Sequence, residues 1–148
     1  MSRAPGRRIV VGVDGSAPSK AALGWAVGQA ELTGAAVEAV YAWQFPYSWW
    51  GWAPPTEESF NFEDNARAIL TEAIDGAIGP DRHVPITPRV IEGNPARVLL
   101  DAAHGADLLV VGNRGHGGFS EALLGSVGQH CVQHAVCPVV IIPGPGTR

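Results

Sequence analysis

The sequence contains little lysine. Lys20 is the one lysine among 148 residues, and the formal net charge at pH 7 is -4. Proteins that bind DNA or RNA normally neutralise the phosphate backbone with clustered lysine and arginine. Lys20 follows Gly15 by five residues and does not complete the Gly-Lys-Ser/Thr of a Walker-type phosphate loop. The composition therefore argues against a nucleic-acid partner and against a Walker-type nucleotide site.

Cysteine is scarce as well. Cys131 and Cys137 are separated by five residues, which matches neither a disulfide framework nor the Cys-x-x-Cys spacing of zinc sites. Free cysteines are commonly buried as small apolar residues. We therefore expect both inside the fold.

Long hydrophobic runs are absent too. The apolar stretch at residues 9–13, which follows Arg3, Arg7 and Arg8, is too short for the core of a signal peptide and runs into Asp14. No later run approaches the roughly 18 apolar residues of a membrane span. We expect a cytoplasmic protein with no membrane segment.

The chain does contain an alternation of short aliphatic segments and helical patterns. At 148 residues and 46% hydrophobic content, residues 1–148 have the size of one compact domain. The alternation predicts an α/β fold, an open five-stranded parallel sheet with right-handed crossovers and helices on both faces. The expected strands are residues 9–13, 36–43, 84–91, 108–111 and 138–142. The expected helices are residues 19–33, about 57–78, a third from residue 95, and about 126–135.

Apolar spacing predicts which helix faces turn inward. The third helix is expected to have Asn94 as its cap and Pro95 in its first turn, where the missing N–H would be unpaired anyway. The expected inward-facing residues are Ala22, Trp25, Ala26, Gln29 and Ala30 in the first helix, Phe62, Ala66, Ile69, Leu70, Ala73 and Ile74 in the second, and Val98, Leu99 and Ala102 in the third.

A segment rich in proline and tryptophan interrupts the alternation at residues 43–56. It contains four of the five tryptophans, and its prolines forbid regular structure. A loop with this much apolar area is either a flap packed on the protein's own surface or a surface for a protein partner. A direct role in ligand binding is a further alternative.

The glycine-rich segment at residues 112–126 is the most informative feature for function. It follows an aliphatic run typical of a buried parallel strand and leads into a helix. Glycines allow unusual dihedrals and a close approach of backbone N–H groups to an anion, and a helix N-terminus adds free N–H groups and a positive dipole end. Ligands bind where strand order reverses at the carboxyl ends of such sheets, and both Asp14 and Gly112 follow strands. The pattern indicates a phosphate-binding loop, with an ordinary loop and helix cap as the alternative.

The spacing Gly112-x2-Gly115-x9-Gly125-Ser126 resembles that of the universal stress protein family, in particular its ATP-binding branch. The likeness runs from residue 8 to residue 143. It implies a Rossmann-like fold of the adenine-nucleotide α-hydrolase kind, in which the loop after the fourth strand surrounds the phosphates. Three further segments are similar to the family's landmarks: residues 11–16 (Val-Gly-Val-Asp-Gly-Ser), 92–96 (Glu-Gly-Asn-Pro-Ala) and 134–140 (His-Ala-Val-Cys-Pro-Val-Val).

The resemblance also implies an ATP site. Gly112 and Gly115 would let the loop wrap the phosphates, and Gly125 and Ser126 would present the helix N-terminus, with the serine hydroxyl adding a hydrogen bond. Val40 matches the position of a main-chain contact with adenine. The implied nucleotide-binding residues are Gly12, Val13, Asp14, Val40, Gly112, Asn113, Arg114, Gly115, His116, Gly117, Gly118, Gly125, Ser126 and Val127.

Several of these side chains have two interpretations. Asp14 is assigned to a ribose hydroxyl or to a bound Mg²⁺, which oxygen ligands suit; the alternative is a cap or turn residue. Gly12 would permit close approach of the nucleotide beside it. Arg114 and His116 would either contact a phosphate or lie passively in solvent.

The aliphatic residues Val13 and Val110 are either walls of the pocket or parts of the core. His130 and His134 are one helical turn apart, which is metal-ligand spacing. The helix lacks the adjoining glutamate of a zinc protease, and no third ligand is evident from the sequence. We therefore expect no metal site at these two histidines.

Three functions are compatible with these features. The first is an ATP-binding regulatory or stress-response protein with at most weak hydrolysis, because phosphoryl transfer needs a catalytic set and only Asp14, Arg114 and His116 are candidates. No catalytic residue is assigned.

The second is an ATP-cleaving transferase, although residues 14–18 replace the His-rich or Ser-Gly-Gly motif typical of those enzymes. The third is an interaction module with a vestigial loop, based on the tryptophan-rich segment and the edge strand 138–142. The resemblance implies a homodimer through that strand.

Overall fold

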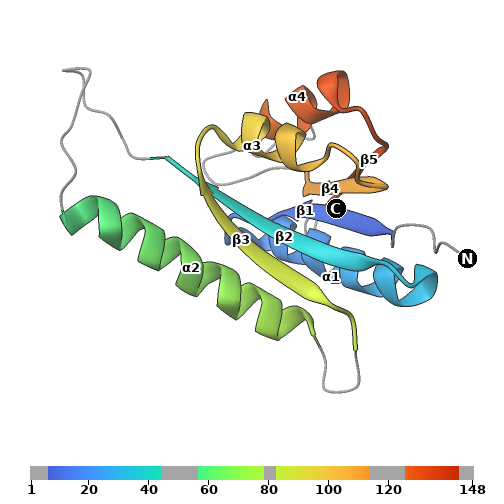
Figure 1. Ribbon diagram of the computed structural model, residues 1–148, viewed down its shortest axis with the longest axis horizontal. Helices are drawn as coiled ribbons and strands as arrows, with labels where there is room; N and C mark the ends of the chain where they lie inside the picture. Colours follow the sequence, from blue (N-terminus) through green and yellow to red (C-terminus); the bar gives the residue numbers. More distant parts are fainter. Residues whose placement is uncertain (1–6, 45–56, 79–82, 114–125, 144–148) are drawn as a thin grey trace, which may run out of the picture.

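The computed structural model describes residues 7–44, 57–78, 83–113 and 126–143. In these ranges five parallel strands form one sheet in the order β3-β2-β1-β4-β5, with helices on both faces (Figure 1). The predicted α/β architecture is confirmed. Along the chain the elements are β1 (Arg8–Gly12), α1 (Ala17–Thr33), β2 (Ala36–Trp43), α2 (Glu57–Ala77), β3 (Ile86–Glu92), α3 (Pro95–Ala102), β4 (Leu108–Gly112), α4 (Ser126–His134) and β5 (Val139–Ile142).

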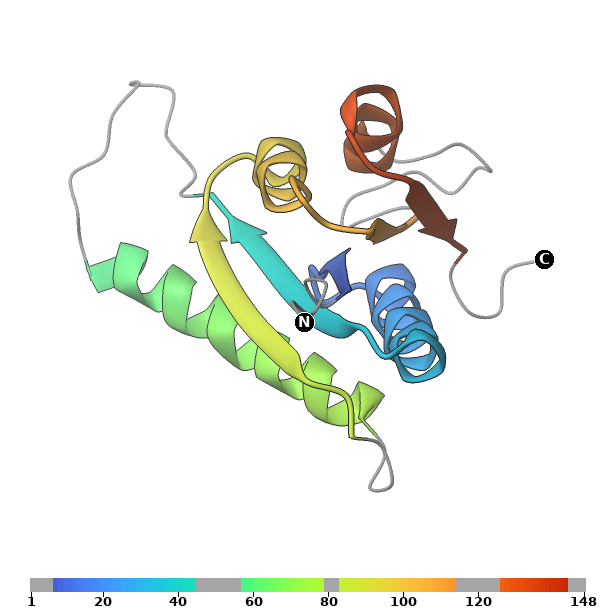
Figure 2. The same cartoon turned by 45° about the vertical axis from the view of Figure 1, so that its right-hand side comes forward.

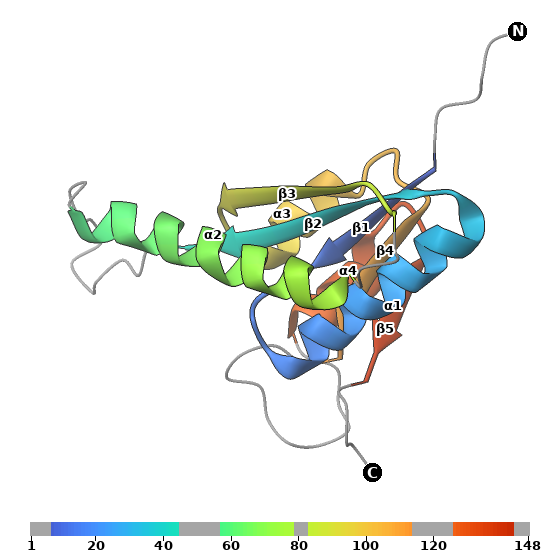
Figure 3. The ribbon, with the colours of Figure 1, turned by 90° about the horizontal axis from the view of Figure 1, so that it is seen from below.

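The sheet separates two apolar clusters. Side chains alternate between the faces of a strand, so Ile9 and Val11 of β1 pack with α1 and α2, whereas Val10 packs with α3 and α4. Figure 2 shows these helix pairs on opposite sides of the sheet, and Figure 3 looks onto α1 and α2. Val10 and Val11 are both fully buried, as expected for a parallel strand covered on both faces.

α1 begins two residues before the predicted start. Ser16 is its cap, because the Ser16 side chain accepts a hydrogen bond from the backbone N–H of Ser19 at 3.3 Å. Pro18 lies in the first turn, where its missing N–H costs little. The helix was therefore predicted to start two residues too late.

The inner face of α1 was only partly predicted. Ala22, Ala26 and Ala30 are buried as expected, but the buried stripe continues through Leu23 and Val27. Trp25, predicted to face inward, is 37% exposed, and Gln29 is only half-buried. Apolar residues flank the alanine stripe on both sides, Leu23 and Val27 on one and Trp25 on the other, so spacing alone did not decide which side packs on the sheet.

The other predicted elements agree with the observed ones within two residues. β3 begins at Ile86 rather than at residue 84 because Pro85 has no N–H for the ladder; its carbonyl accepts a hydrogen bond from Val37 at 2.9 Å. Asn94 caps α3 as predicted, its side chain accepting from the N–H of Arg97 at 3.1 Å. None of the helices in the described ranges is long and apolar enough to cross a bilayer.

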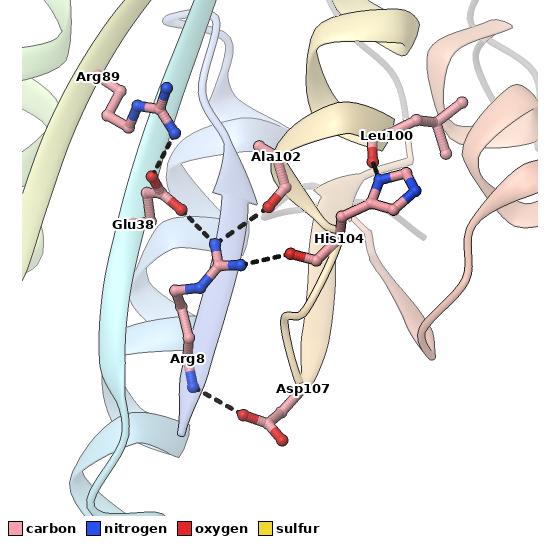
Figure 4. A network of polar contacts seen from close by, with 7 residues as sticks. All are labelled: Arg8, Glu38, Arg89, Leu100, Ala102, His104 and Asp107. Carbon is pink, nitrogen blue, oxygen red and sulfur yellow. Dashed lines mark hydrogen bonds and ion pairs between the residues drawn. The ribbon is translucent and has the colours of Figure 1, made fainter. Parts of the chain in front are cut away.

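An ion-pair network links three strands to the end of α3 (Figure 4). Arg8 of β1 donates to Glu38 of β2 at 2.5 Å, and Arg89 of β3 donates to the other carboxylate oxygen of Glu38 at 2.6 Å. Arg8 also donates to the carbonyls of Ala102 and His104 at 3.0 and 2.7 Å, so it satisfies acceptors at and just beyond the end of α3. The Glu38 side chain is 13% exposed, so its charge is compensated by two cations away from most solvent.

Cys131 is fully buried on α4, whereas Cys137 is partly exposed, so the expected burial holds completely only for Cys131. Burial raises the pKa of the Cys131 thiol to about 11, and Cys137 adds to the shift. Burial also raises the pKa of Cys137, against the opposing effect of Arg8. Both thiols therefore stay protonated near neutral pH.

The substitution Glu38→Ala is expected to lower the free energy of unfolding by about 1–3 kcal/mol, because it leaves two arginines without their shared partner. Glu63→Ala is the matched control: Glu63 pairs with Arg67 one helical turn away, at 43% exposure, and its loss should cost no more than about 0.5 kcal/mol. Urea unfolding measures both. Equal losses would contradict a special role for Glu38.

The Cys131 thiol should make stability fall as pH rises from about 9 to about 11. In this window the unfolded chain loses a proton that the folded chain keeps, because the folded pKa is the higher one. The full effect is about 2–3 kcal/mol. Urea midpoints measured across this window should fall less steeply for Cys131→Ala than for the parent chain. Parallel profiles would show that the thiol contributes nothing to the pH dependence.

Candidate functional site

The carboxyl ends of β1 and β4 lie side by side where the strand order reverses. β1 pairs with β2 on one edge and with β4 on the other. Asp14, which follows β1, and Asn113, which follows β4, therefore emerge at the same edge of the sheet. Open parallel sheets bind ligands at such a point, and the sequence correctly placed the Asp14 and Gly112 segments there.

The carboxylate of Asp14 helps close the turn into α1. Asp14 Oδ1 accepts a hydrogen bond from the backbone N–H of Ser16 at 2.9 Å, and the Asp14 N–H donates to Ser19 Oγ at 3.1 Å. Gly15, between Asp14 and Ser16, has a φ of 85°, a conformation that favours glycine. The turn interpretation of Asp14 is thus confirmed for one carboxylate oxygen.

Tyr41 of β2 is a neighbour of Asp14 that the sequence did not reveal. Burial raises the pKa of Tyr41 above its usual value, and the charge of Asp14 raises it further. Tyr41 packs on the cluster formed with α1 and α2. No motif marked it, because a tyrosine in a strand is ordinarily a β-forming residue.

Packing explains two glycines at this edge. A Cβ on Gly112 would lie 2.7 Å from the carbonyl carbon of Pro18, and one on Gly12 would lie 2.8 Å from Cδ1 of Leu99. The first contact is with backbone, which yields little, whereas the second is with a flexible side-chain end. Gly112 therefore allows the start of α1 to approach the end of β4, a role that needs no ligand.

The N-termini of two helices at this edge have few free N–H groups, because a capping side chain and a proline occupy their first turns. Helices that follow parallel strands all start at the carboxyl edge, where their free N–H groups attract anions. In α1 the cap Ser16 accepts from Ser19, and Pro18 has no N–H. In α3 the cap Asn94 accepts from the third residue of the helix, and Pro95 has no N–H. Both helices offer few donors to a ligand.

The other two N-termini differ in charge. α2 begins with Glu57 and Glu58, whose negative charge suits the dipole but opposes a bound anion. α4 begins with Ser126, Val127 and Gly128, a first turn with neither acid nor proline. Among the four helices, α4 is the one whose first turn suits an anion.

The first turn of α4 adjoins the end of β4. A Cβ on Gly128 would lie 3.8 Å from the carbonyl oxygen of Gly112, and Val127 packs on the cluster shared with α3. Ser126 is the first residue of this helix. The remaining loop residues predicted to bind phosphate lie outside the described residues: Arg114, Gly115, His116, Gly117, Gly118 and Gly125.

The predicted main-chain contact at Val40 needs correction. The Val40 carbonyl accepts a hydrogen bond from the Val13 N–H at 2.9 Å, so it belongs to the sheet rather than to the edge. Successive peptide groups of a strand face opposite neighbours, and the Trp43 carbonyl is taken by Gly93 on the β3 side. Ala42 is therefore the first residue of β2 that faces the β1 side beyond the end of β1. Register, which the sequence did not show, accounts for the error.

Val13 and Val110 belong to the core. Val13 is 3% exposed and Val110 is fully buried, both in the cluster with α1 and α2. Of the two interpretations open from the sequence, core packing is confirmed.

Asn113 carries an unsatisfied acceptor at this edge. Its N–H donates to the carbonyl of Ile142 at 2.9 Å, which extends the β4–β5 ladder. Its side-chain Oδ1 is buried and has no hydrogen-bond partner among the described residues. An unpaired buried acceptor costs about 1–3 kcal/mol. A ligand with a hydroxyl or amine donor fits this position.

Metal ligands are sparse at this edge. Within the described ranges, no group of three or more histidine, cysteine, aspartate or glutamate residues could hold a metal ion. Asp14 Oδ1 already accepts the bond from Ser16. A Mg²⁺ at Asp14 would therefore need most of its oxygen ligands from phosphates and water, as Mg²⁺ commonly has.

The substitution Gly112→Ala is expected to destabilise the fold by about 1–3 kcal/mol, because the added methyl meets the Pro18 backbone. Gly28→Ala in α1 is the control: its Cβ would meet nothing within 4 Å, and alanine should gain about 0.5–1 kcal/mol in a helix. Urea unfolding without ligand separates the two. A neutral Gly112→Ala would refute the packing role.

Comparisons with known proteins agree on the family. The family model described as "Universal stress protein family" matches residues 6–143. A universal stress protein of Mycobacterium tuberculosis is 35% identical over 135 residues, covering 90% of this chain and 44% of that protein. The chain thus spans about half the length of the curated relatives it matches.

Solved structures share the architecture. A universal stress protein in complex with cAMP has a TM-score of 0.71 at 30% identity, covering 95% of this chain and 98% of that one. A universal stress protein from Archaeoglobus fulgidus in complex with dAMP, 21% identical, has a TM-score of 0.66 and covers 92% and 97% of the two chains; it shows the same fold. These matches explain both the glycine spacing and the strand order: the chain belongs to the universal stress protein family.

Proposed function

We propose that this chain binds an adenine nucleotide, ATP in particular, at the carboxyl edge between β1 and β4. The main support is a difference among the four helix N-termini. A capping side chain and a proline occupy the first turns of α1 and α3, and two glutamates begin α2, so the first turn of α4 is the one that suits phosphates. The 30% identical relative in complex with cAMP supports an adenine nucleotide as the ligand class.

The phosphates would lie between the glycine-rich segment and α4. Glycines there let backbone N–H groups approach an anion, the Ser126 hydroxyl adds a donor, and Arg114 adds a charge-assisted contact. The proposed phosphate-binding residues are Gly112, Asn113, Arg114, Gly115, His116, Gly117, Gly118, Gly125, Ser126 and Val127.

The base and ribose would lie toward β2. The main chain of Ala42, rather than that of Val40, would contact the adenine edge, because it faces the space beyond β1. Asp14 would contact a ribose hydroxyl or a Mg²⁺ held by the phosphates. A nucleotide hydroxyl or amine would also supply a donor to Asn113 Oδ1, which has none among the described residues.

The chain is proposed to hold the nucleotide and to hydrolyse it weakly at most. Fast phosphoryl transfer needs a positioned metal, a charge-stabilising cation and a group that orients the nucleophile. The sequence offers Asp14, Arg114 and His116 for these tasks. A nucleotide-dependent regulatory or stress-response role in the cytoplasm fits this set better than catalysis.

Assembly is part of the proposal. β5 pairs with β4 along one edge, and its four residues are half-buried, so its other edge suits a second copy, giving a homodimer through residues 138–142. The tryptophan-rich segment begins at Trp43, which stacks on Phe62 of α2 with ring centroids 6.4 Å apart. This contact supports the flap interpretation for Trp43, whereas residues 45–56 lie outside the described ranges. A protein partner there stays a proposal.

Isothermal titration of nucleotide-stripped protein with ATP, with and without Mg²⁺, tests the site. Gly115→Ala and Gly125→Ala should each weaken binding about tenfold or more, since a side chain restricts the loop and blocks close approach. Gly76→Ala in α2 is the control, because its Cβ would meet nothing within 4 Å, and its affinity should match the parent's. Undiminished affinity in both loop variants would overturn the assignment. Sustained product formation from ATP would instead favour the transferase.

A further inference from the structure

The carboxyl half of α4 carries two histidines outside the proposed nucleotide site. His130 and His134 are four residues apart on one helix, and both are exposed. Their ring centroids lie 4.7 Å apart, and the ring planes are inclined by 38°. The sequence showed only the spacing; the structure shows that the two rings are neighbours and that solvent reaches both.

This arrangement suits a metal ion that prefers nitrogen. Neutral imidazole is the commonest protein ligand for Zn²⁺, Ni²⁺ and Cu²⁺, with metal–nitrogen distances of about 2.0–2.1 Å for zinc. Two histidines at i and i+4 face the same side of a helix and can chelate one ion. Both side chains are exposed, so each can make the small rotation that aims one ring nitrogen at a shared ion.

The helix itself favours a cation at this position. His134 lies in the last turn of α4, where the unpaired carbonyls give the helix its negative end. Ser126, at the opposite end of α4, is four residues from His130 and eight from His134, which corresponds to about 6 Å and about 12 Å along a helix. The two histidines thus lie toward the carboxyl end of α4, and a metal ion there does not require the nucleotide site.

We propose that His130 and His134 form a two-imidazole site for a late first-row divalent metal ion such as Ni²⁺ or Zn²⁺. In the described ranges, no third histidine, cysteine or carboxylate joins them in a metal-binding group. Water completes the coordination. The site is consequently open and exchangeable, unlike a closed structural zinc site with four protein ligands.

Isothermal titration of EDTA-treated, desalted protein with NiCl₂ tests the proposal. The parent chain should bind one Ni²⁺, and His130→Ala or His134→Ala should each weaken that binding about tenfold or more. The reason is that an ion bound to one imidazole no longer has a second imidazole held close to it at high effective concentration. His104→Ala is the matched control, an exposed histidine just after α3 whose partner is a backbone carbonyl. It should bind Ni²⁺ as the parent does. MgCl₂, which prefers oxygen ligands, should give no such binding.

Imidazole NMR spectra give a second readout. Substoichiometric Ni²⁺ is paramagnetic and should broaden the ring signals of His130 and His134 before those of His83 and His104. The proposal is overturned if Ni²⁺ fails to bind the parent, if both alanine variants bind as well as the parent, or if other histidine signals broaden first. Far-UV circular dichroism and urea midpoints, unchanged in the two variants, exclude loss of the helix as the cause.

Discussion

β1 is paired on both edges and covered on both faces, and the rest of the molecule is arranged around that constraint. A strand in this position can present only aliphatic residues to its two helical layers, and Ile9, Val10 and Val11 meet the requirement. The chain must leave β1 in opposite directions to build the two halves of the sheet. The space beyond its carboxyl end therefore lies between the two halves, at the kind of position where open parallel sheets bind ligands.

The four helix N-termini at this edge differ in how well they suit an anion. A parallel sheet directs every following helix toward its carboxyl edge, and each N-terminus is a potential anion site. Capping side chains and prolines consume this capacity in α1 and α3, and acidic residues oppose it in α2. Of the four N-termini, only that of α4 begins with neither an acidic residue nor proline, and it is the one to which the nucleotide proposal assigns the phosphates.

The sequence was sufficient for the architecture because each signal was local. Aliphatic runs, helical spacing and the Asn94-Pro95 start of α3 depend on neighbours in the chain, and the element bounds predicted from them agree with the structure within two residues. The errors depended on distant contacts. Val40 was misassigned because strand register decides which carbonyl is free, and Trp25 because the opposite layer decides which stripe is buried. The contact between Gly112 and Pro18 joins residues about ninety positions apart, and no local pattern could reveal it.

The pairing of β1 with β4 also governs the order in which the protein is completed during synthesis. Arg8 and Asp107, which hydrogen-bond at 2.8 Å, are 99 residues apart. While a ribosome makes the chain from its N-terminus, β1 can pair with β2, but its other edge waits for β4. Until β4 has been made, one edge of the buried strand β1 therefore stays open, the kind of surface that aggregates or recruits chaperones. In a nascent chain of this topology, both edges of β1 are paired only once β4 has followed.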